Sequence, residues 1–300
     1  MKKTISLLLI IIGLSACTDN EFPRVPKVET ITSDLLGNDA VSLDKHGNIF
    51  VSEFGVFGET GGSGTRIFKV TKNGLVSEAV TNLSGPLGNA IDTKGNIYVN
   101  DANNLSNGNV LKISKKGKRT ILATIDGFPS GLTIDKNNNI YVSNFSAPTV
   151  HKISPDGTVS LFASDPRLAG CVGIDFDISG NIIVGNFATA DILSISPNGE
   201  VSLVTNIPNI VVQGFGIGYI TVIKNTVFAT GIGVNKIFKV SIPDGSFSEL
   251  VGTGELKTID GDFSEAAFSN PNGIASDKKN KILYVSEFGN TALRKIYLPK

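Results

Sequence analysis

Short runs of apolar residues recur between residues 28 and 297, and polar turn residues separate them. One turn in five of the six units has Asp at its first position and Gly or Asn at its fourth, as in Asp44 to Gly47, whereas the fifth unit lacks the Asp and keeps Asn225. An Asp side chain accepts backbone N–H bonds in such a turn, and Gly or Asn tolerates positive φ, so each turn predicts a hairpin. The turn residues fall at positions 47, 95, 138, 180, 225 and 280. A period of ~40–50 residues is typical of propeller blades.

A second turn signal follows the third apolar run of most units, as in Pro155-Asp156-Gly157. The third runs are rich in β-branched residues and cover residues 66–70, 110–113, 150–153, 192–195, 237–240 and 293–296. Two turns and short β-type runs in every unit predict four antiparallel strands. The chain is therefore predicted to be all-β, a six-bladed β-propeller, with an open β-solenoid as the alternative.

The strand count predicts how the ring closes. Six units supply first, second and third strands, but only five turns lead to a fourth strand before the sequence ends. Residues 28–33 resemble the fourth strand of a middle unit, residues 158–164. We therefore expect residues 28–33 to complete the last blade, so that residues 28–300 form the propeller. Such closure hides sheet edges that could otherwise pair with other chains.

The N-terminus has the features of an export signal. Lys2 and Lys3 precede ten apolar residues, 5–14, and ten helical residues rise ~15 Å, half the ~30 Å of a bilayer core. Residues 1–16 are therefore predicted to be a signal peptide rather than a membrane span. The sequence Leu-Ser-Ala-Cys that ends at Cys17 resembles the bacterial lipobox. The alternative is an ordinary signal peptide with an incidental cysteine.

The lipobox resemblance implies lipidation of Cys17 by palmitate-like acyl chains, and residues 17–27 would then be a tether. More than one acyl chain anchors a protein stably. We therefore expect a protein of the bacterial cell envelope, bound to the membrane through Cys17 and facing either the periplasm or the surface.

Composition excludes several classes of function. Lys plus Arg and Asp plus Glu are each 27, and loss of residues 1–16 leaves a net charge of −2. Without a basic tract, a nucleic-acid partner is not expected. The two cysteines cannot build a disulfide-rich scaffold, and Cys171 is predicted to be a small buried residue. The sequence contains no G-x-S-x-G, H-E-x-x-H, C-x-x-C or P-loop motif.

Residues 269–277, 283–290 and 293–296 together resemble an NHL repeat, and the similarity extends more loosely over residues 37–297. The chain also resembles the wider group of six-bladed propellers that includes the gluconolactonase/regucalcin family and the streptogramin lyases. That group contains both enzymes and binding proteins, so the fold alone does not give the function. The lyases need a catalytic His near the channel mouth, whereas His46 lies in a hairpin turn and His151 in a third strand.

The first candidate set is the residue two places after the Val of the second strand. Its members are Glu53, Asp101, Asn144, Asn186, Gly231 and Glu287. Five of the six offer carboxylate or amide oxygens, which suit a hard cation such as Ca²⁺. The alternative is that each polar side chain caps the following turn inside its own blade.

The second set lies five places before the turn Asp. Its members are Asp39, Leu87, Ser130, Val172, Ile217 and Asn272. The gluconolactonase resemblance implies one divalent cation, Ca²⁺ or Zn²⁺, held here to polarise a lactone carbonyl and activate water. Asp39 and Asn272 match that pattern in type, whereas Leu87, Val172 and Ile217 depart from it.

These features favour an envelope-anchored propeller, expected to be a monomer, that binds a small ligand or a protein partner at the channel mouth. The alternative is a divalent-metal-dependent lactonase or esterase. A third hypothesis is an accessory subunit of an envelope complex.

Overall fold

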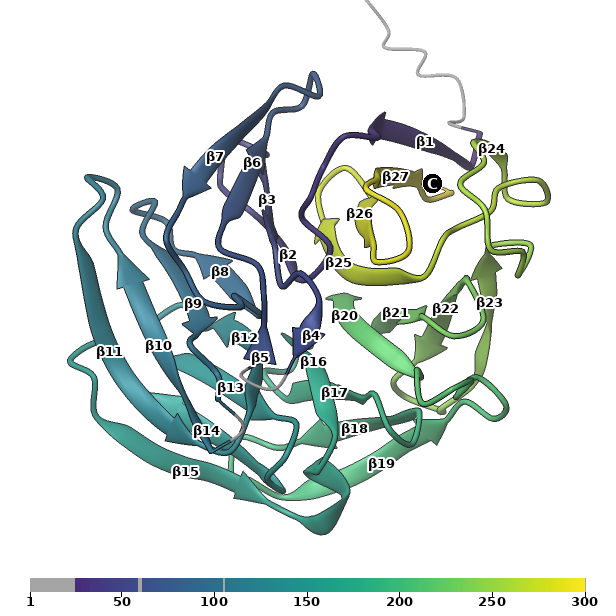
Figure 1. The fold of residues 1–300 in the computed structure, drawn as a ribbon. Helices are drawn as coiled ribbons and strands as arrows, with labels where there is room; N and C mark the ends of the chain where they lie inside the picture. Colours follow the sequence, from purple (N-terminus) through teal and green to yellow (C-terminus); the bar gives the residue numbers. More distant parts are fainter. Residues whose placement is uncertain (1–24, 59–60, 105, 300) are drawn as a thin grey trace, which may run out of the picture.

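The computed structural model describes residues 25–58, 61–104 and 106–299, which form a ring of antiparallel sheets (Figure 1). Five sheets have four strands in chain order, and a sixth joins the two ends of the described chain. The one helix in these ranges is a single 3-10 turn, Pro166–Leu168. The prediction of an all-β, six-bladed propeller is confirmed.

The first three blades follow one another along the chain. Blade 1 contains β2 (Val41–Leu43), β3 (Ile49–Ser52), β6 (Ile67–Val70) and β7 (Val76–Val80). Blade 2 contains β8 (Asn89–Ile91), β9 (Ile97–Asp101), β10 (Asn107–Ile113) and β11 (Arg119–Asp126). Blade 3 contains β12 (Pro129–Ile134), β13 (Ile140–Asn144), β14 (Thr149–Ile153) and β15 (Val159–Ser164). Between β3 and β6 a small hairpin is formed by β4 (Phe57–Gly58) and β5 (Gly61–Gly62).

The last three blades continue the ring. Blade 4 contains β16 (Cys171–Phe176), β17 (Ile182–Asn186), β18 (Asp191–Ile195) and β19 (Val201–Asn206). Blade 5 contains β20 (Ile217–Ile223), β21 (Thr226–Gly231), β22 (Lys236–Ser241) and β23 (Phe247–Val251). Blade 6 contains β25 (Pro271–Asp277), β26 (Ile282–Glu287), β27 (Leu293–Tyr297), β1 (Lys27–Thr32) and the short β24 (Gly261–Asp262).

The first described strand closes the ring. β1 runs antiparallel to β27, with Val28 opposite Ile296 and Thr32 opposite Leu293, and the two lie side by side in Figure 1. Val28 is almost fully buried in the core between blades. The predicted closing strand at residues 28–33 is thus confirmed, one residue earlier than expected at each end.

The Asp turns form as the sequence predicts. Asp44 Oδ1 accepts the backbone N–H groups of His46 at 2.8 Å and Asn48 at 2.9 Å, and Gly47 has φ of 75°. In blades 5 and 6 the positive φ falls on Lys224 and Lys281 rather than on the expected Asn. The reason is loop length, because Ile223 pairs with Thr226 across a two-residue loop, whereas Asp277 pairs with Ile282 across four.

Apolar side chains fill the layers between neighbouring blades, and the innermost strands pack against one another in order around the channel. This packing is tight, because a Cβ on Gly131 would lie 1.8 Å from the carbonyl oxygen of Val172 in the next blade. Buried polar side chains also form hydrogen bonds across the boundaries between neighbouring blades. They are Asn89 to Ser52, Asn100 to Ser130 O, Ser143 to Val172 O, Thr230 to Asn272 O and Ser286 to Asp39 O.

Candidate functional site

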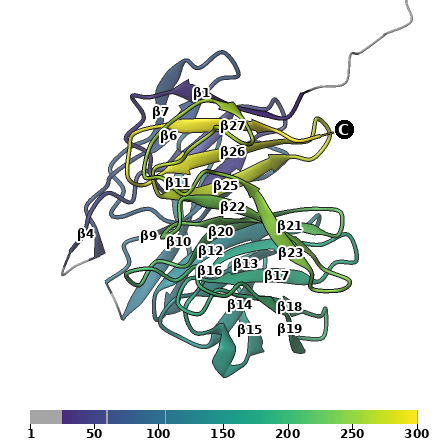
Figure 2. The same cartoon turned by 90° about the vertical axis from the view of Figure 1, so that its right-hand side faces the viewer.

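One face of the ring gathers both candidate sets. We call it the mouth face, and it consists of the loops from the second to the third strand of each blade and the segments that lead into the first strands. The β4–β5 hairpin projects from this face, at the left of Figure 2. The opposite face, formed by the Asp turns, is called the turn face. β1 begins on the turn face, because Lys27 pairs with Tyr297 at the far end of β27.

The two asparagines of the first set are engaged by backbone groups of the loop that follows them and of the segment that leads into the first strand of their blade. Asn144 Oδ1 accepts the backbone N–H groups of Phe128 at 2.9 Å and Ala147 at 3.0 Å, while its Nδ2 donates to Asp126 O. Asn186 makes the equivalent contacts with Arg167, Ala169, Ala188 and Thr189. These side chains therefore serve as turn caps, the alternative that the sequence left open.

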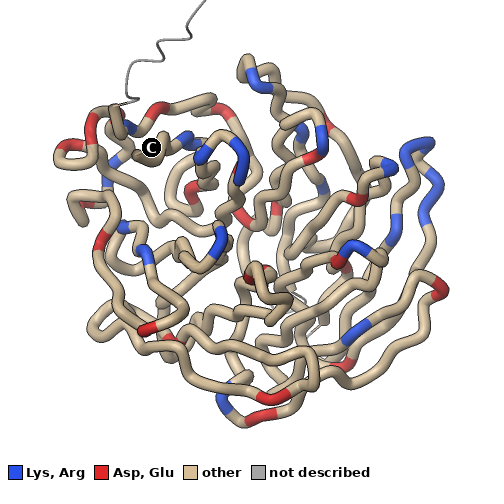
Figure 3. Tube along the Cα trace, turned by 180° about the vertical axis from the view of Figure 1, so that it is seen from behind, with Lys and Arg blue, Asp and Glu red and all other residues tan. Residues whose placement is uncertain are grey.

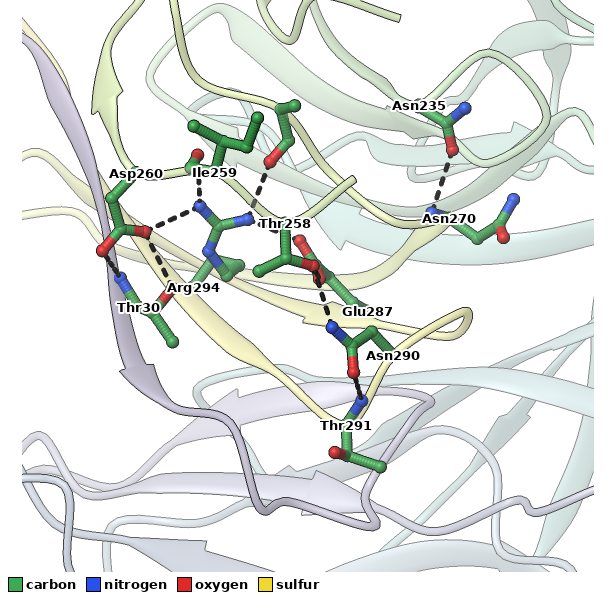
Figure 4. A network of polar contacts seen from close by, with 11 residues as sticks. Thr30, Asn235, Thr258, Ile259, Asp260, Asn270, Glu287, Asn290, Thr291 and Arg294 are labelled. Carbon is green, nitrogen blue, oxygen red and sulfur yellow. Dashed lines mark hydrogen bonds and ion pairs between the residues drawn. The ribbon is translucent and has the colours of Figure 1, made fainter. Parts of the chain in front are cut away.

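The two glutamates of the first set each bind an arginine of their own blade. Glu53 pairs with Arg66 at 2.8 Å, and Glu287 pairs with Arg294 at 2.6 Å. Burial raises the pKa of Glu53, but hydrogen bonds from Arg66 and Thr65 N outweigh it and the pKa lies below its ordinary value. For Glu287 burial dominates, and its pKa is raised despite the bonds from Thr258 and Arg294 (Figure 4).

Asp101 binds the segment that leads into β8. Its Oδ1 accepts the backbone N–H of Ser84 at 2.7 Å, and burial raises the pKa of its carboxyl against that bond. Gly231, the sixth position, has no side chain to offer. The first set is thus distributed over six separate loops.

The structure brings together two residues of the second set. Asn272 Nδ2 donates to Asp39 Oδ2 at 3.0 Å, and the hydroxyl of Tyr219 donates to Asp39 Oδ1 at 2.5 Å. Asp39 is 6% exposed, and burial raises its pKa to about 6 although the bonds from Tyr219, Ala40 N and Asn272 oppose the rise. Burial, together with the neighbouring Asp39 charge, raises the pKa of Tyr219 well above its ordinary value.

The other members of the second set do not join this cluster. Ser130 is buried, and its hydroxyl donates to Phe128 O at 3.0 Å. Leu87 packs with Phe54 and Phe128, whereas Val172 and Ile217 belong to other apolar clusters.

This donor set does not fit a divalent cation of the gluconolactonase kind. Asp39 is occupied by three hydrogen-bond donors, and Asn272 turns its N–H group rather than its oxygen toward it. In the part of the chain that the structure describes, no three His, Cys, Asp or Glu residues lie together as a metal site would require. We therefore derive no reaction step through a metal.

A series of phenylalanines occupies the mouth face, and the sequence analysis did not predict it. Consecutive ring centroids lie 5.7 to 6.2 Å apart. In order of contact the rings are Phe54, Phe57, Phe128, Phe145, Phe187, Phe215 and Phe288, and we call them the phenylalanine rim. Phe57, Phe145, Phe215 and Phe288 are 58%, 39%, 36% and 41% exposed. Exposed apolar groups gathered at one site are typical of a binding surface.

A repeated pattern in the sequence does indicate this rim. Phe directly follows the first-set residue in four blades, as in Asn144-Phe145 and Glu287-Phe288. The polar side chain is held by backbone groups or by an arginine, and the phenylalanine that follows it joins the rim.

The remaining predicted residues lie away from the rim or outside the described chain. The signal peptide, Cys17 and most of the tether fall outside the described residues, so their assignments stay predictions. Cys171 is buried, which raises the pKa of its thiol. His46 is exposed in its turn, and His151 lies half-buried in β14. No helix within the described ranges is long and apolar enough to cross a bilayer.

A separate cleft of about 310 Å³ lies between blades 4 and 5 and extends from Val234 and residues 207–210 to Phe247 on the outer strand β23. Phe238, Phe247 and Pro208 contribute its apolar wall. Its charged groups, Lys236 and Glu249, are joined to each other at 2.7 Å.

Comparison with solved structures supports the propeller fold. The chain is similar to an auxiliary nutrient binding protein from Bacteroides ovatus, with a TM-score of 0.73 and 16% identity over 92% of this chain and 77% of that chain. A gluconolactonase from Xanthomonas campestris gives 0.67 and 12% identity over 92% and 91% of the two chains. Virginiamycin B lyase from Staphylococcus aureus gives 0.60 and 18% identity over 86% and 79%. No protein-family model and no curated protein matches the chain.

Proposed function

We propose that this protein is a cell-envelope propeller that binds a small ligand or a protein partner at the phenylalanine rim. The observation that carries the proposal is the exposure of four rim phenylalanines on one face, above polar residues engaged in internal hydrogen bonds. A surface of this kind offers contact area for binding and few groups for acid–base chemistry. A nutrient binding protein among the structural neighbours supports a binding role.

The anchor in this proposal is lipid on Cys17, and it sets the direction of the mouth. β1 begins on the turn face, and ten residues, 17–26, reach at most ~35 Å when extended. A lipid on Cys17 would therefore hold the turn face toward the membrane and leave the mouth face open. Figure 3 shows the chain from behind, with Lys and Arg positions in blue among Asp and Glu positions in red. The turns between first and second strands carry exposed lysines, which suit an anionic lipid surface. They are Lys45, Lys94, Lys136 and Lys224.

A photo-crosslinker tests the binding site directly. We would place p-benzoylphenylalanine at position 145 of the full chain in intact cells, with position 247 as the control, because Phe247 has a similar exposure of 41% but lies on an outer strand. We expect a discrete adduct from position 145 and none from position 247. Absence of any adduct from position 145, and equally from position 288, would overturn the proposal.

A labelling experiment tests the anchor. Cys17→Ser should abolish incorporation of labelled palmitate and release the protein from the membrane fraction, whereas Cys171→Ala should leave both unchanged. Palmitate labelling that survives Cys17→Ser would exclude this mode of attachment.

A metal-dependent lactonase is the second candidate, which rests on the gluconolactonase among the structural neighbours, whereas the hydrogen bonds of Asp39 and Asn272 count against it. A panel of lactones with and without EDTA distinguishes the two functions. Turnover that EDTA removes, and that Asp39→Ala and Asn272→Ala abolish, would replace the binding proposal. Hydrolysis at the buffer rate throughout would support binding without catalysis.

A further inference from the structure

The loops that carry the phenylalanine rim are almost free of charge. Five of the six loops between second and third strands contain no Lys, Arg, Asp or Glu, namely residues 102–106, 145–148, 187–190, 232–235 and 288–292. In the sixth loop, Glu53 and Arg66 are paired to each other at 2.8 Å, and a third charged residue, Glu59, lies outside the described residues. A charged ligand would lose its hydration at the described part of the rim without gaining a charged partner there, which costs free energy.

Three polar side chains beside the rim are engaged by the protein itself. Asn144 and Asn186 bind backbone groups through both their oxygen and their nitrogen atoms. Glu287 is fully buried and binds Arg294 and Thr258. A sugar needs several directed hydrogen bonds in addition to an aromatic surface, and these side chains do not supply them.

The rings are arranged to accept another ring. Phe145 and Phe187 have centroids 5.7 Å apart with an interplanar angle of 76°, and Phe187 and Phe215 have 5.7 Å and 67°. These edge-to-face contacts extend from blade to blade around the mouth and leave part of each exposed ring open. A flat apolar group fits such an arrangement, because aromatic pairs favour edge-to-face and offset contacts.

We propose that the rim binds an uncharged organic molecule that has a flat apolar ring system. This ring system enters the mouth before the rest of the molecule. This inference rests on the proposed binding at the mouth and specifies its ligand class. It assigns Phe145, Phe215 and Phe288 as specificity-determining residues, and it places no hydrogen bond or charge of the protein on the ring.

The test uses N-phenyl-1-naphthylamine, an uncharged fluorescent probe, with the full chain carrying Cys17→Ser so that no detergent is needed. We expect saturable binding of one probe per chain. Phe145→Ala and Phe288→Ala should each weaken it about tenfold, the effect of losing roughly 1.4 kcal/mol of aromatic contact. Phe145→Leu should fall between wild type and Phe145→Ala, since it keeps apolar area but loses the ring. Thermal melting of each variant confirms that it folds.

Phe247→Ala is the matched control, since Phe247 belongs to the cleft between blades 4 and 5. Its probe affinity should equal that of the wild type. If Phe247→Ala weakens binding and Phe145→Ala does not, the probe occupies that cleft and the inference fails.

Three competitors that share the same naphthalene ring but differ in charge test whether the rim prefers an uncharged ligand. They are 2-naphthalenemethanol, 2-naphthoate and 2-naphthylmethylammonium. We expect the neutral alcohol to displace the probe best, and stronger displacement by either ion would overturn the inference. If the probe does not bind but position 145 still crosslinks to a partner in cells, the ligand class is wrong and the proposed function stands. Absence of both probe binding and crosslinking removes both.

Discussion

Asp260 connects the closing strand to the last blade through Thr30, a residue 230 positions away in sequence. Its carboxylate accepts the backbone N–H of Thr30 at 2.9 Å and the Thr30 hydroxyl at 2.7 Å (Figure 4). The same carboxylate accepts a bond from Arg294 Nη2 at 2.9 Å. Because β1 is the strand that completes blade 6, this pair stabilises the closure of the ring.

Asp260→Ala should weaken that closure. The Thr30 N–H and hydroxyl lose a charged acceptor, which we expect to cost about 1–3 kcal/mol of unfolding free energy. Hydrogen exchange should become faster at Thr30 while the amides of β12 keep their protection. Asp262→Ala, which removes a carboxylate that binds Ser264 in its own loop, is the control. Unchanged exchange at Thr30 would contradict the prediction.

Glu287→Gln should lower the free energy of unfolding more than the same substitution does at an exposed glutamate. Glu287 and Arg294 both have 0% side-chain exposure, so the substitution removes the buried anionic partner of the guanidinium and leaves only Asp260, whose side chain is 50% exposed. We expect a loss of about 3–5 kcal/mol in urea denaturation. Glu255→Gln breaks a pair with Lys257 in which both side chains are 59% exposed, and it should cost about 1 kcal/mol or less. Equal losses in the two variants would contradict the argument.

Asp39 makes stability depend on pH. Burial raises its folded-state pKa to about 6 from an ordinary 3.8, so its contribution is fully present below about pH 4 and is lost as pH rises through 6. The loss should reach about 3 kcal/mol. Asp39→Asn should remove this dependence in urea midpoints measured from pH 4 to pH 8.

Tyr219→Phe provides the complementary test. The Tyr219 hydroxyl lowers the pKa of Asp39 by donating to it, so its removal should raise that pKa further and move the loss of stability to higher pH. The same pH profile in Tyr219→Phe and wild type would show that the hydroxyl does not act on Asp39.

Ser286→Ala should loosen the boundary between blades 6 and 1. The buried Ser286 hydroxyl donates to Asp39 O at 2.7 Å and accepts from Gly273 N at 3.0 Å, so alanine leaves two buried backbone groups without this partner. We expect a cost of about 1–3 kcal/mol in thermal or urea unfolding. Ser160→Ala, at an exposed position on β15, should be close to neutral.

The candidate site was less predictable from the sequence than the fold. Asn144 and Asn186 were selected for their oxygen atoms, but their backbone partners depend on how each loop turns after the second strand. The sequence showed that Leu87 and Val172 cannot be metal ligands, because their side chains are apolar. In the structure both pack against apolar neighbours. The contact between Asp39 and Tyr219 joins residues that are 180 positions apart in the sequence, and no local sequence pattern predicts it.

The sequence by itself determined the number of blades, their strand order and the closure by residues near 28–33. Turn chemistry and β-type runs are local, and they repeat six times, so each unit supports the assignment of the others. Only the tertiary structure decided the character of the mouth. The phenylalanine rim consists of contacts between different blades, as between Phe187 and Phe215, and these exist only after the ring closes and brings loops far apart in the chain to one face.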